Sequence, residues 1–442
     1  MSSQFRVGII GGGTGGLCLA QALHKASVPV VVYERSGART DRLQGYRVHI
    51  NPDGSRALHE CLPAEQWQTF VETCGSPGGA FTFVNEQLKE LLLIDDDVTT
   101  DTERDPTQSH HSVSRVTLHQ LLSAGLDDVL HLGKEFERYE RATDGTVTCH
   151  FTDGTTTTVD VLVGADGANS RIRRQYLPAA QRIDTGIRAI AGKLPLTDEV
   201  KSWLPTRMQT GPNNVLPPSG CGMFMAPHDL SDSLLSTTTT THGIGGNDTA
   251  VARSLHFDNT TSYLMWAYAA NSGKYPCGDA ELSALDGVGL RDLAGRQTAG
   301  WHPDLRRMVA DTPGETVSLL PIRTSLPVKQ WETTNITVLG DAIHSMTPFR
   351  GIGANTALRD AQLLARNLIE AARGQRDLLE AIHDYETQMI DYGFAAVRLS
   401  LRTAEQTISN NWLGRSMFKA ALRLFAAVPS LKRKAFADLG ND

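Results

Sequence analysis

Residues 5–34 read FRVGIIGGGTGGLCLAQALHKASVPVVVYE. The stretch begins as a short apolar strand, passes through a cluster of glycines, continues with apolar residues at helical spacing, and ends in a second strand rich in β-branched residues. Strand, glycine-rich turn, helix and strand within about 30 residues are typical of a βαβ unit with parallel strands. The sequence therefore predicts an α/β fold with a Rossmann-like parallel sheet.

The glycines of this stretch have the spacing GxGxxG, with Gly11, Gly13 and Gly16. The first permits a tight turn, the second lets the backbone approach a pyrophosphate, and the third allows close packing between helix and strand. Glu34 follows Gly16 by 18 residues, where a carboxylate can accept hydrogen bonds from ribose hydroxyls. An acid there disfavours a 2′-phosphate, although Arg35 directly after it weakens that argument. We predict that this turn binds the adenosine diphosphate half of a dinucleotide.

A second motif, GADGANSR, occupies residues 164–171. It follows a predicted hairpin over 147–164, whose last strand is apolar. Alone, the pair Asp166-Gly167 is a turn signal that many proteins share. The motif becomes informative only together with the other two.

A third motif, GDAIHSMTPFRGIGAN, occupies residues 340–355 and follows an apolar strand over 336–339. Asp341 stands at the strand end, where its carboxylate can accept hydrogen bonds from a polyol. The next segment starts a long amphipathic helix, whose free N–H groups and positive dipole end favour an anionic ring system. The alternative for this segment is a loop with an ordinary helix cap.

The order and spacing of the three motifs resemble the single-component FAD-dependent aromatic monooxygenases, the family of the p-hydroxybenzoate and salicylate hydroxylases. The resemblance covers nearly the whole chain. It implies FAD as the cofactor and NADPH or NADH as a transient electron donor. It also implies an α/β fold in which a Rossmann-like FAD-binding domain carries an inserted β-sheet substrate domain and C-terminal helices. We expect the FAD-binding domain at 1–185 and 326–375, the substrate domain at 186–325 and the C-terminal helical region at 376–442.

The resemblance also implies cofactor contacts. The first motif would bind the ADP half of FAD, the second would handle FAD and the nicotinamide nucleotide, and the third would hold the ribityl chain and run beside the isoalloxazine ring. Arg115 would contact FAD near its ribose or phosphates, and Arg47 would contact the flavin or its phosphates, with Arg42 competing for the same role. The predicted cofactor-binding residues are Gly11, Gly13, Gly16, Glu34, Arg35, Arg47, Arg115, Asp166, Gly167, Asp341, Pro348, Gly351, Gly353, Ala354 and Asn355.

The chemistry that the resemblance implies is hydroxylation or epoxidation of a hydrophobic aromatic or polycyclic small molecule by O2, through a flavin hydroperoxide. Reactions of this kind occur in secondary metabolism, where we expect this protein to act. An FAD-dependent oxidoreductase, a Baeyer–Villiger-type oxygenase and a non-catalytic FAD-binding protein remain alternatives on the same scaffold. We name no catalytic residue, because the sequence contains no nucleophile triad and the acids and bases of the family differ between branches.

Composition restricts the remaining function classes. The 442 residues carry a formal net charge of -7, which argues against a nucleic-acid partner. The six cysteines include no CxxC pair, which disfavours a thiolate metal site and fits a reducing compartment. The first residues lack the pattern of a signal peptide, so we expect a cytoplasmic protein. The sequence shows no cluster of metal ligands, so we expect no metal. The oligomeric state stays open.

Two features allow two interpretations each. Tyr263, Trp266 and Tyr268 share one predicted strand and would either line a substrate pocket or pack in the core. The segment 412–434 mixes apolar residues with Lys and Arg, so it would form either an interfacial membrane helix or a helix packed on the FAD-binding domain. We favour the core and the packed helix, and therefore expect no membrane contact.

Overall fold

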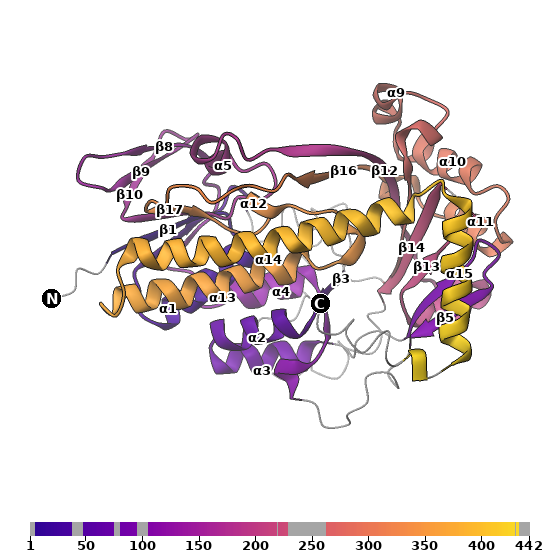
Figure 1. Cartoon of the computed structure of the whole chain (residues 1–442), viewed down its shortest axis with the longest axis horizontal. Helices are drawn as coiled ribbons and strands as arrows, with labels where there is room; N and C mark the ends of the chain where they lie inside the picture. Colours follow the sequence, from indigo (N-terminus) through magenta and orange to yellow (C-terminus); the bar gives the residue numbers. More distant parts are fainter. Residues whose placement is uncertain are drawn as a thin grey trace. The chain divides into compact units, whose positions relative to one another are not determined.

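The computed structural model describes residues 5–37, 47–74, 80–94, 105–218, 220–228, 262–428 and 430–432. The chain forms two compact units, each assembled from segments that are distant in sequence (Figure 1). Unit 1 comprises Met1–Cys74, Arg104–Ile183 and Thr324–Leu401, and unit 2 comprises Gly75–Glu103, Asp184–Arg323 and Arg402–Asp442. The predicted C-terminal region at 376–442 is divided between the two units, and 75–103, predicted in the FAD-binding domain, belongs to unit 2.

Unit 1 is organised around a five-stranded parallel sheet with the strand order β17-β11-β1-β2-β7. Its strands are β1 (Val7–Ile10), β2 (Val30–Tyr33), β7 (Leu130–His131), β11 (Val161–Gly164) and β17 (Ile336–Val338). Every residue of β1, β2, β11 and β17 is buried, as expected for parallel strands that are covered on both faces. The predicted α/β fold with a Rossmann-like parallel sheet is confirmed.

Helix α1 (Thr14–Lys25) connects β1 to β2 and packs against α13 (Gly353–Ala372). A Cβ atom on Gly15 would lie 2.7 Å from the Leu339 side chain and 3.1 Å from the Ala357 carbonyl oxygen, so this approach requires glycine. The long helix α14 (Leu378–Thr407) begins beside α13 (Figure 1). The other helices of unit 1 are α2 (Pro52–Cys61), α3 (Ala64–Thr73), η2 (Pro106–Gln108), α4 (Arg115–Ser123), α5 (Arg171–Tyr176), α12 (Asp341–His344) and η5 (Pro348–Arg350).

Two small antiparallel sheets complete the strands described in unit 1. One pairs β3 (Arg47–Ile50) with β6 (His111–Ser114). The other contains β8 (Phe136–Arg141), β9 (Val147–Phe151) and β10 (Thr156–Val159). The β9–β10 hairpin is the one predicted before the second motif.

Unit 2 contains a seven-stranded mixed sheet with the order β16-β12-β15-β14-β13-β4-β5. The strands are β4 (Phe81–Val84), β5 (Glu90–Ile94), β12 (Arg182–Pro195), β13 (Asn213–Val215), β14 (Cys221–His228), β15 (Tyr263–Asn271) and β16 (Ser318–Ser325). The helices are α6 (Asp198–Trp203), α7 (Thr206–Thr210), η3 (Ser272–Lys274), α9 (Asp279–Ala284), α10 (Gly287–Gln297), α11 (Pro303–Ala310), η4 (Gly314–Thr316) and α15 (Trp412–Ala427).

Trp266 and Tyr268 are buried in the core of this unit, and the Trp266 indole N–H donates to Thr312 Oγ1 at 2.9 Å. The core interpretation of these two aromatic residues is confirmed.

Within the ranges that the structure describes, no helix has a long enough apolar stretch to cross a bilayer. The same ranges contain no group of three or more His, Cys, Asp or Glu side chains placed to hold a metal ion.

A buried carboxylate joins α14 to the sheet of unit 1. Glu386 is fully buried, and its two oxygens accept hydrogen bonds from Thr333 Oγ1 at 2.7 Å and Thr337 Oγ1 at 2.9 Å. Burial raises the pKa of Glu386 to about 7, because the two hydroxyls only partly replace the water that a carboxylate loses. The folded protein therefore holds a proton here at pH values at which the unfolded chain has lost it.

This carboxylate predicts a pH-dependent stability. Because the folded-state pKa lies above the ordinary value, the stability of the protein falls as the pH rises from about 4.5 through 7. Glu386→Gln removes this titration. From acidic to mildly alkaline pH, the unfolding free energy of the parent should therefore fall by about 1–3 kcal/mol relative to that of the variant. Urea unfolding across this range measures the difference. Glu380→Gln, at an exposed position of the same helix, is the control, and equal pH profiles for parent and Glu386→Gln would contradict the prediction.

Candidate active site

The carboxyl ends of three adjacent parallel strands bring the three motifs to one edge of the sheet. Strand β11 lies between β1 and β17, with Ile10 beside Gly164 and Gly164 beside Val338. The Ala165 N–H donates to the Ile10 carbonyl at 2.8 Å, and the Leu339 N–H donates to the Gly164 carbonyl at 3.0 Å. Open α/β sheets bind their ligands at this edge.

The glycine-rich turn after β1 has the geometry that its spacing predicts. Gly11 has φ of 113°, and a Cβ atom there would lie 2.2 Å from the Ala165 carbonyl oxygen. A Cβ atom on Gly16 would lie 2.1 Å from the Gly11 carbonyl oxygen. Gly13 differs, because it has φ of -80° and a Cβ atom there would meet no heavy atom within 4 Å. The turn is therefore closed at Gly11 and Gly16 and open at Gly13.

A pocket of about 280 Å³ lies at this turn, beside the N-terminus of α1. Seven of the predicted cofactor-binding residues line it, and Gly16 lies just behind the turn. The pocket is lined by Ile10, Gly11, Gly12, Gly13, Thr14, Tyr33, Glu34, Arg35, Ser36, Arg115, His119, Lys134, Glu135, Phe136, Ala165, Asp166, Gly167, Asn169 and Arg171. It thus joins the first two motifs, whereas no residue of the third motif lines it.

Two backbone donors hold the carboxylate of Glu34. Its Oε2 accepts from the Gly12 N–H at 2.7 Å, and its Oε1 accepts from the Ser36 N–H at 2.9 Å. A carboxylate oxygen can accept a second hydrogen bond, so both oxygens can still accept from ligand hydroxyls. This half-buried carboxylate is therefore oriented before any ligand binds.

Sequence reasoning missed several side chains of the pocket. His119 lies one helical turn after Arg115, and one of its ring nitrogens, Nε2, is 2.9 Å from the Gly12 carbonyl oxygen. Arg171 donates to Glu135 Oε1 and to the Phe136 carbonyl, both at 2.5 Å. The i, i+4 spacing from Arg115 could have indicated His119, because such residues share a helix face. Lys134 and Glu135 lie outside all three motifs, and no sequence signal indicates them.

Asp166 of the second motif is a half-buried acid of this pocket. Its Oδ2 accepts from the Arg171 N–H at 2.7 Å. Its Oδ1 is buried and accepts no hydrogen bond from the described part of the chain. Burial raises the pKa of Asp166, and the hydrogen bonds at the start of α5 only partly oppose that shift. A buried acceptor without a protein donor fits a hydroxyl or N–H group of a bound cofactor.

A second missed residue, Arg173, ties the second motif to the third. Its buried guanidinium donates to the Ala168 carbonyl at 3.1 Å and to the Ala342 carbonyl at 2.7 Å. The two carbonyls belong to loops that follow β11 and β17. The basic stretch 171–174 was visible in the sequence, but only the fold shows which of its members points inward.

The third motif presents its polar groups differently from the first two. Asp341 is exposed at the first residue of α12, directly after Gly340, which has φ of 61°. Pro348 and Gly351 are exposed, and Gly353 and Ala354 start α13. No side chain caps the first turn of α13 within the described chain, so its N–H groups remain available to a ligand.

The side chain of Asn355 has a structural role. Its side-chain oxygen accepts from the Asn51 N–H at 3.0 Å, and its amide nitrogen donates to the His49 carbonyl at 2.9 Å. The side chain thereby anchors the start of α13 to the end of β3, and the backbone N–H of Asn355 remains available to a cofactor. The side chain of Arg47, on β3, and all of Arg42 lie outside the described residues, so the roles predicted for them stay predictions.

Asp360 anchors the third motif from inside the protein. Its Oδ2 accepts from the Gly340 N–H and contacts His344 Nε2, each at 2.7 Å, and its Oδ1 accepts from the Tyr392 hydroxyl at 2.6 Å. Burial by itself lowers the pKa of His344, but the charge of Asp360 outweighs that effect and the pKa is raised. The loop after β17 is thus fastened to α13 and α14 through one carboxylate.

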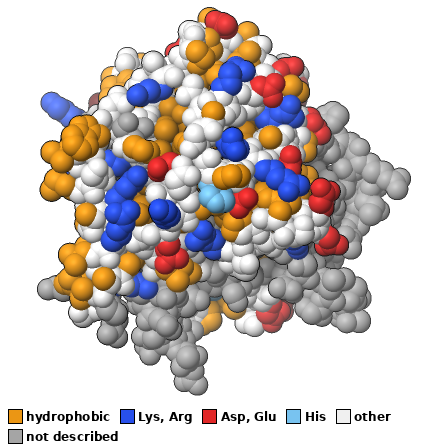
Figure 2. All heavy atoms as spheres, turned by 90° about the vertical axis from the view of Figure 1, so that its right-hand side faces the viewer, with side chains coloured by type: hydrophobic (Ala, Val, Ile, Leu, Met, Phe, Trp, Pro, Cys, Tyr) orange, Lys and Arg blue, Asp and Glu red, His pale blue; other side chains and the backbone are white. Residues whose placement is uncertain are grey.

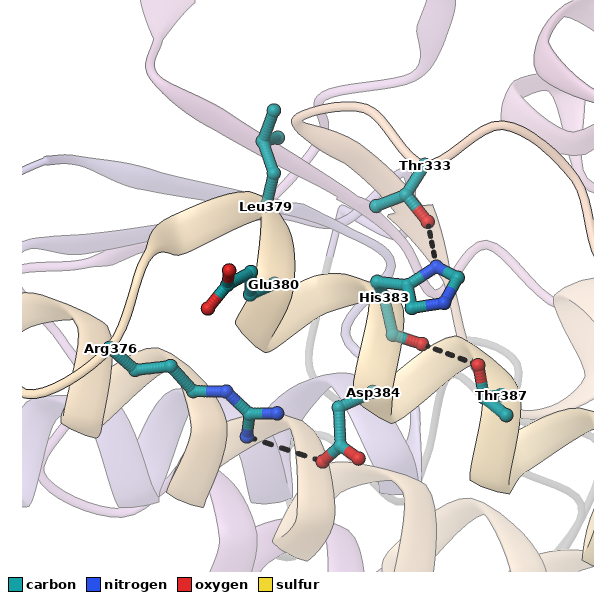
Figure 3. A pocket seen from close by; sticks show the side chains of 7 residues that line it. All are labelled: Thr333, Arg376, Leu379, Glu380, His383, Asp384 and Thr387. Atoms are coloured by element: carbon teal, nitrogen blue, oxygen red, sulfur yellow. Dashed lines mark hydrogen bonds and ion pairs between the residues drawn. The ribbon is translucent and has the colours of Figure 1, made fainter.

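A second hollow, of about 580 Å³, lies at the start of α14 (Figure 3). It is lined by Thr333, Arg376, Leu379, Glu380, His383, Asp384 and Thr387. Its polar groups satisfy one another: Arg376 pairs with Asp384 at 3.3 Å, and Thr333 Oγ1 is 3.0 Å from His383 Nδ1. None of the three motifs contributes to it, so we do not assign it to the active site.

The open position at Gly13 predicts a selective loss of cofactor. Gly13→Ala adds a methyl group that touches no protein atom, so folding should be unchanged while the approach of a pyrophosphate is blocked. We expect FAD affinity to fall by about tenfold or more, with an unchanged melting temperature of the apoprotein. Gly295→Ala is the matched control, because a Cβ atom there also meets nothing within 4 Å. Equal FAD content in the two purified variants would contradict this use of Gly13.

The Asp360 contacts predict a large effect on stability. Asp360→Asn removes a buried charge with three partners and should lower the unfolding free energy by about 2–4 kcal/mol, whereas Tyr392→Phe removes one donor and should cost about 1 kcal/mol. Because the pKa of His344 is raised, its ion pair stabilises the fold below about pH 6 and weakens as the pH rises through that raised pKa. Urea unfolding of both variants at several pH values tests this. If Asp360→Asn lowers the unfolding free energy no more than Tyr392→Phe does, Asp360 is not the anchor of this loop.

Comparison with known proteins agrees with this geometry. A family model described as an FAD binding domain matches residues 298–400. The FAD-dependent monooxygenase dbaB of Emericella nidulans is 30% identical over 376 residues, which cover 82% of this chain and 86% of that protein. The dual O-methyltransferase/FAD-dependent monooxygenase elcB of Phaeosphaeria nodorum is 30% identical over 415 residues, but the chain spans only 43% of its length.

The similarity extends to a solved structure. A protein of Photorhabdus luminescens assigned to the FAD-containing monooxygenases is 36% identical, with a TM-score of 0.78 over 91% of this chain and 98% of that one. FAD, the cofactor predicted from the motifs, fits the open turn at Gly13 and the buried acceptor of Asp166. The chain that holds these three loops at one sheet edge belongs to the family of FAD-dependent monooxygenases.

Proposed function

We propose that this chain is an NAD(P)H- and O2-dependent monooxygenase that hydroxylates or epoxidises a hydrophobic aromatic or polycyclic small molecule. The observation that carries the proposal is the convergence of the three motif loops at the carboxyl ends of β1, β11 and β17. Family membership supports the proposal, and the substrate is inferred from the resemblance of the motifs alone.

The residues of the first two motifs would hold the adenosine half of FAD. Glu34 would accept hydrogen bonds from the ribose hydroxyls with the free lone pairs of its two oxygens. Gly13 would let the pyrophosphate approach the N-terminus of α1, where the helix dipole favours its charge. Asp166 Oδ1 would accept the hydrogen bond that no described protein group supplies.

The third motif would hold the reactive half. When bound, FAD accepts electrons from NAD(P)H and activates O2 for transfer of one oxygen atom. Asp341 would accept hydrogen bonds from the ribityl hydroxyls. The N–H groups of Gly353, Ala354 and Asn355 would stabilise negative charge on the reduced ring, as a helix N-terminus does for anions. Arg173 and Asp360 would act as positioning residues, since they fasten the loops without reaching the pocket surface.

The alternative reactions would use the same cofactor site. A Baeyer–Villiger-type oxygenase would use the same loops with a ketone as substrate, and an FAD-dependent oxidoreductase would return no oxygen atom to its product. No second GxGxxG occurs in the sequence, so we propose that the nicotinamide nucleotide binds only transiently. The mass of the product after turnover with isotope-labelled O2 separates an oxygenase from an oxidoreductase.

The proposed function predicts that substrate controls flavin reduction. The visible absorbance of the FAD-loaded protein, mixed anaerobically with NADPH or NADH, should bleach faster by a factor on the order of ten or more when the right aromatic or polycyclic compound is present. Asp341→Ala should weaken FAD binding by about tenfold, because a hydrogen bond to a charged group is lost. Asp198→Ala, at an exposed site in unit 2, is the control. FAD that is bound but reduced by neither nucleotide, with any compound of the panel, would refute the proposal.

A further inference from the structure

Among the described residues, helix α15 of unit 2 packs through one side. Leu422 packs with Leu91, Leu92 and Leu216, and Phe425 adds to this cluster. The opposite side of the helix faces outward. The sequence alone favoured a helix packed on the FAD-binding domain, but α15 packs against β5 of unit 2.

Arg415 fixes the rotation of α15. The buried guanidinium donates to the carbonyls of Pro217 at 3.2 Å, Cys221 at 2.7 Å and Gln406 at 3.2 Å, and also to that of Thr407. These carbonyls come from two segments of unit 2. The outward face of α15 is therefore set by a buried charged anchor.

The outward face of α15 is an apolar ridge. Of the eleven large apolar side chains that are exposed in the described part of the chain, five belong to this helix. These five, the α15 ridge, are Trp412, Leu413, Met417, Phe418 and Leu424, with exposed fractions of 68%, 55%, 66%, 49% and 53%. Leu413, Met417 and Leu424 follow one another at four and seven residues, which places them on one helix face. A clustered apolar patch of this kind marks an interaction surface.

The segment of sequence that carries the ridge contains Lys and Arg but no acidic residue. Residues 406–437 contain six Lys and Arg and no Asp or Glu, in a chain whose net charge is -7. Arg423 is exposed on α15, while Lys419 lies 3.7 Å from Glu86. On the face of the molecule that includes α15, apolar side chains lie beside Lys and Arg side chains (Figure 2). A second copy pairing ridge to ridge would bring these cations together, whereas an anionic surface would complement them.

We propose that the α15 ridge and its neighbouring cations dock this protein on the head-group region of an anionic lipid membrane. An exposed apolar face with Trp, Phe and Leu, flanked by Lys and Arg, is the pattern of helices that lie in the plane of a membrane surface. The helix is anchored in the fold before it meets lipid, so docking needs no unfolding of α15. The contact is independent of the proposed oxygenase reaction.

Vesicle sedimentation of the full chain loaded with FAD tests the proposal. The protein should pellet with vesicles that contain phosphatidylglycerol, pellet far less with phosphatidylcholine alone, and be released by high salt. Leu424→Glu should lower the bound fraction by about tenfold or more. Leu379→Glu, a leucine of 46% exposure on α14, is the matched control and should bind as the parent does. Arg423→Gln should weaken binding about fivefold.

Fluorescence gives a second readout that does not depend on activity. Binding should shift the tryptophan emission of the parent to shorter wavelength, and Trp412→Phe should lose most of that shift while it still pellets with anionic vesicles. Vesicle binding that Leu424→Glu leaves unchanged would overturn the proposal. So would a dimer in lipid-free solution that Leu424→Glu dissociates, because the ridge would then join two copies of the chain. Flavin content and melting temperature of each variant confirm that it is folded.

Discussion

Hydrogen bonds between β1, β11 and β17 determine where the cofactor-binding loops of unit 1 lie. The three strands come from widely separated parts of the chain, yet their pairing sets Ile10, Gly164 and Val338 side by side. Parallel strands end at the same edge of a sheet, so the loops that follow them must converge. The pocket at Gly13, the orientation of Glu34 and the linkage through Arg173 all depend on this alignment.

Buried charges then hold the converged loops in place. Arg173 joins the loops after β11 and β17, and Asp360 fastens the loop after β17 to the helices behind it. A buried charge destabilises a protein unless hydrogen bonds replace the water it has lost. Asp360 has three such contacts, so its charge acts as a positional restraint. The polar groups that face the pocket are thereby free to meet a ligand, because other groups carry the structural contacts.

Unit 2 uses the same principle for another purpose. Its wide sheet is closed by an apolar core around Trp266 and Tyr268, and a buried arginine holds α15 against this unit. Both faces of α15 carry apolar side chains, so its amphipathic pattern alone cannot distinguish the packed face from the free one. Arg415 distinguishes the two faces, because its buried guanidinium donates to backbone carbonyls of unit 2.

The βαβ unit, the apolar strands before each motif and the long helix after the third motif could all be predicted from the sequence, and the resemblance of the motifs supplied the cofactor. These features rest on short-range patterns: glycine at a tight turn, β-branched runs and helical spacing. The fold was needed to show that Lys134 and Arg171 share the pocket, that the Asn355 side chain is an anchor, and that residues of 80–94 pair in the sheet of unit 2. These outcomes depend on which distant segments pair and which face of each element is buried, and local spacing specifies neither.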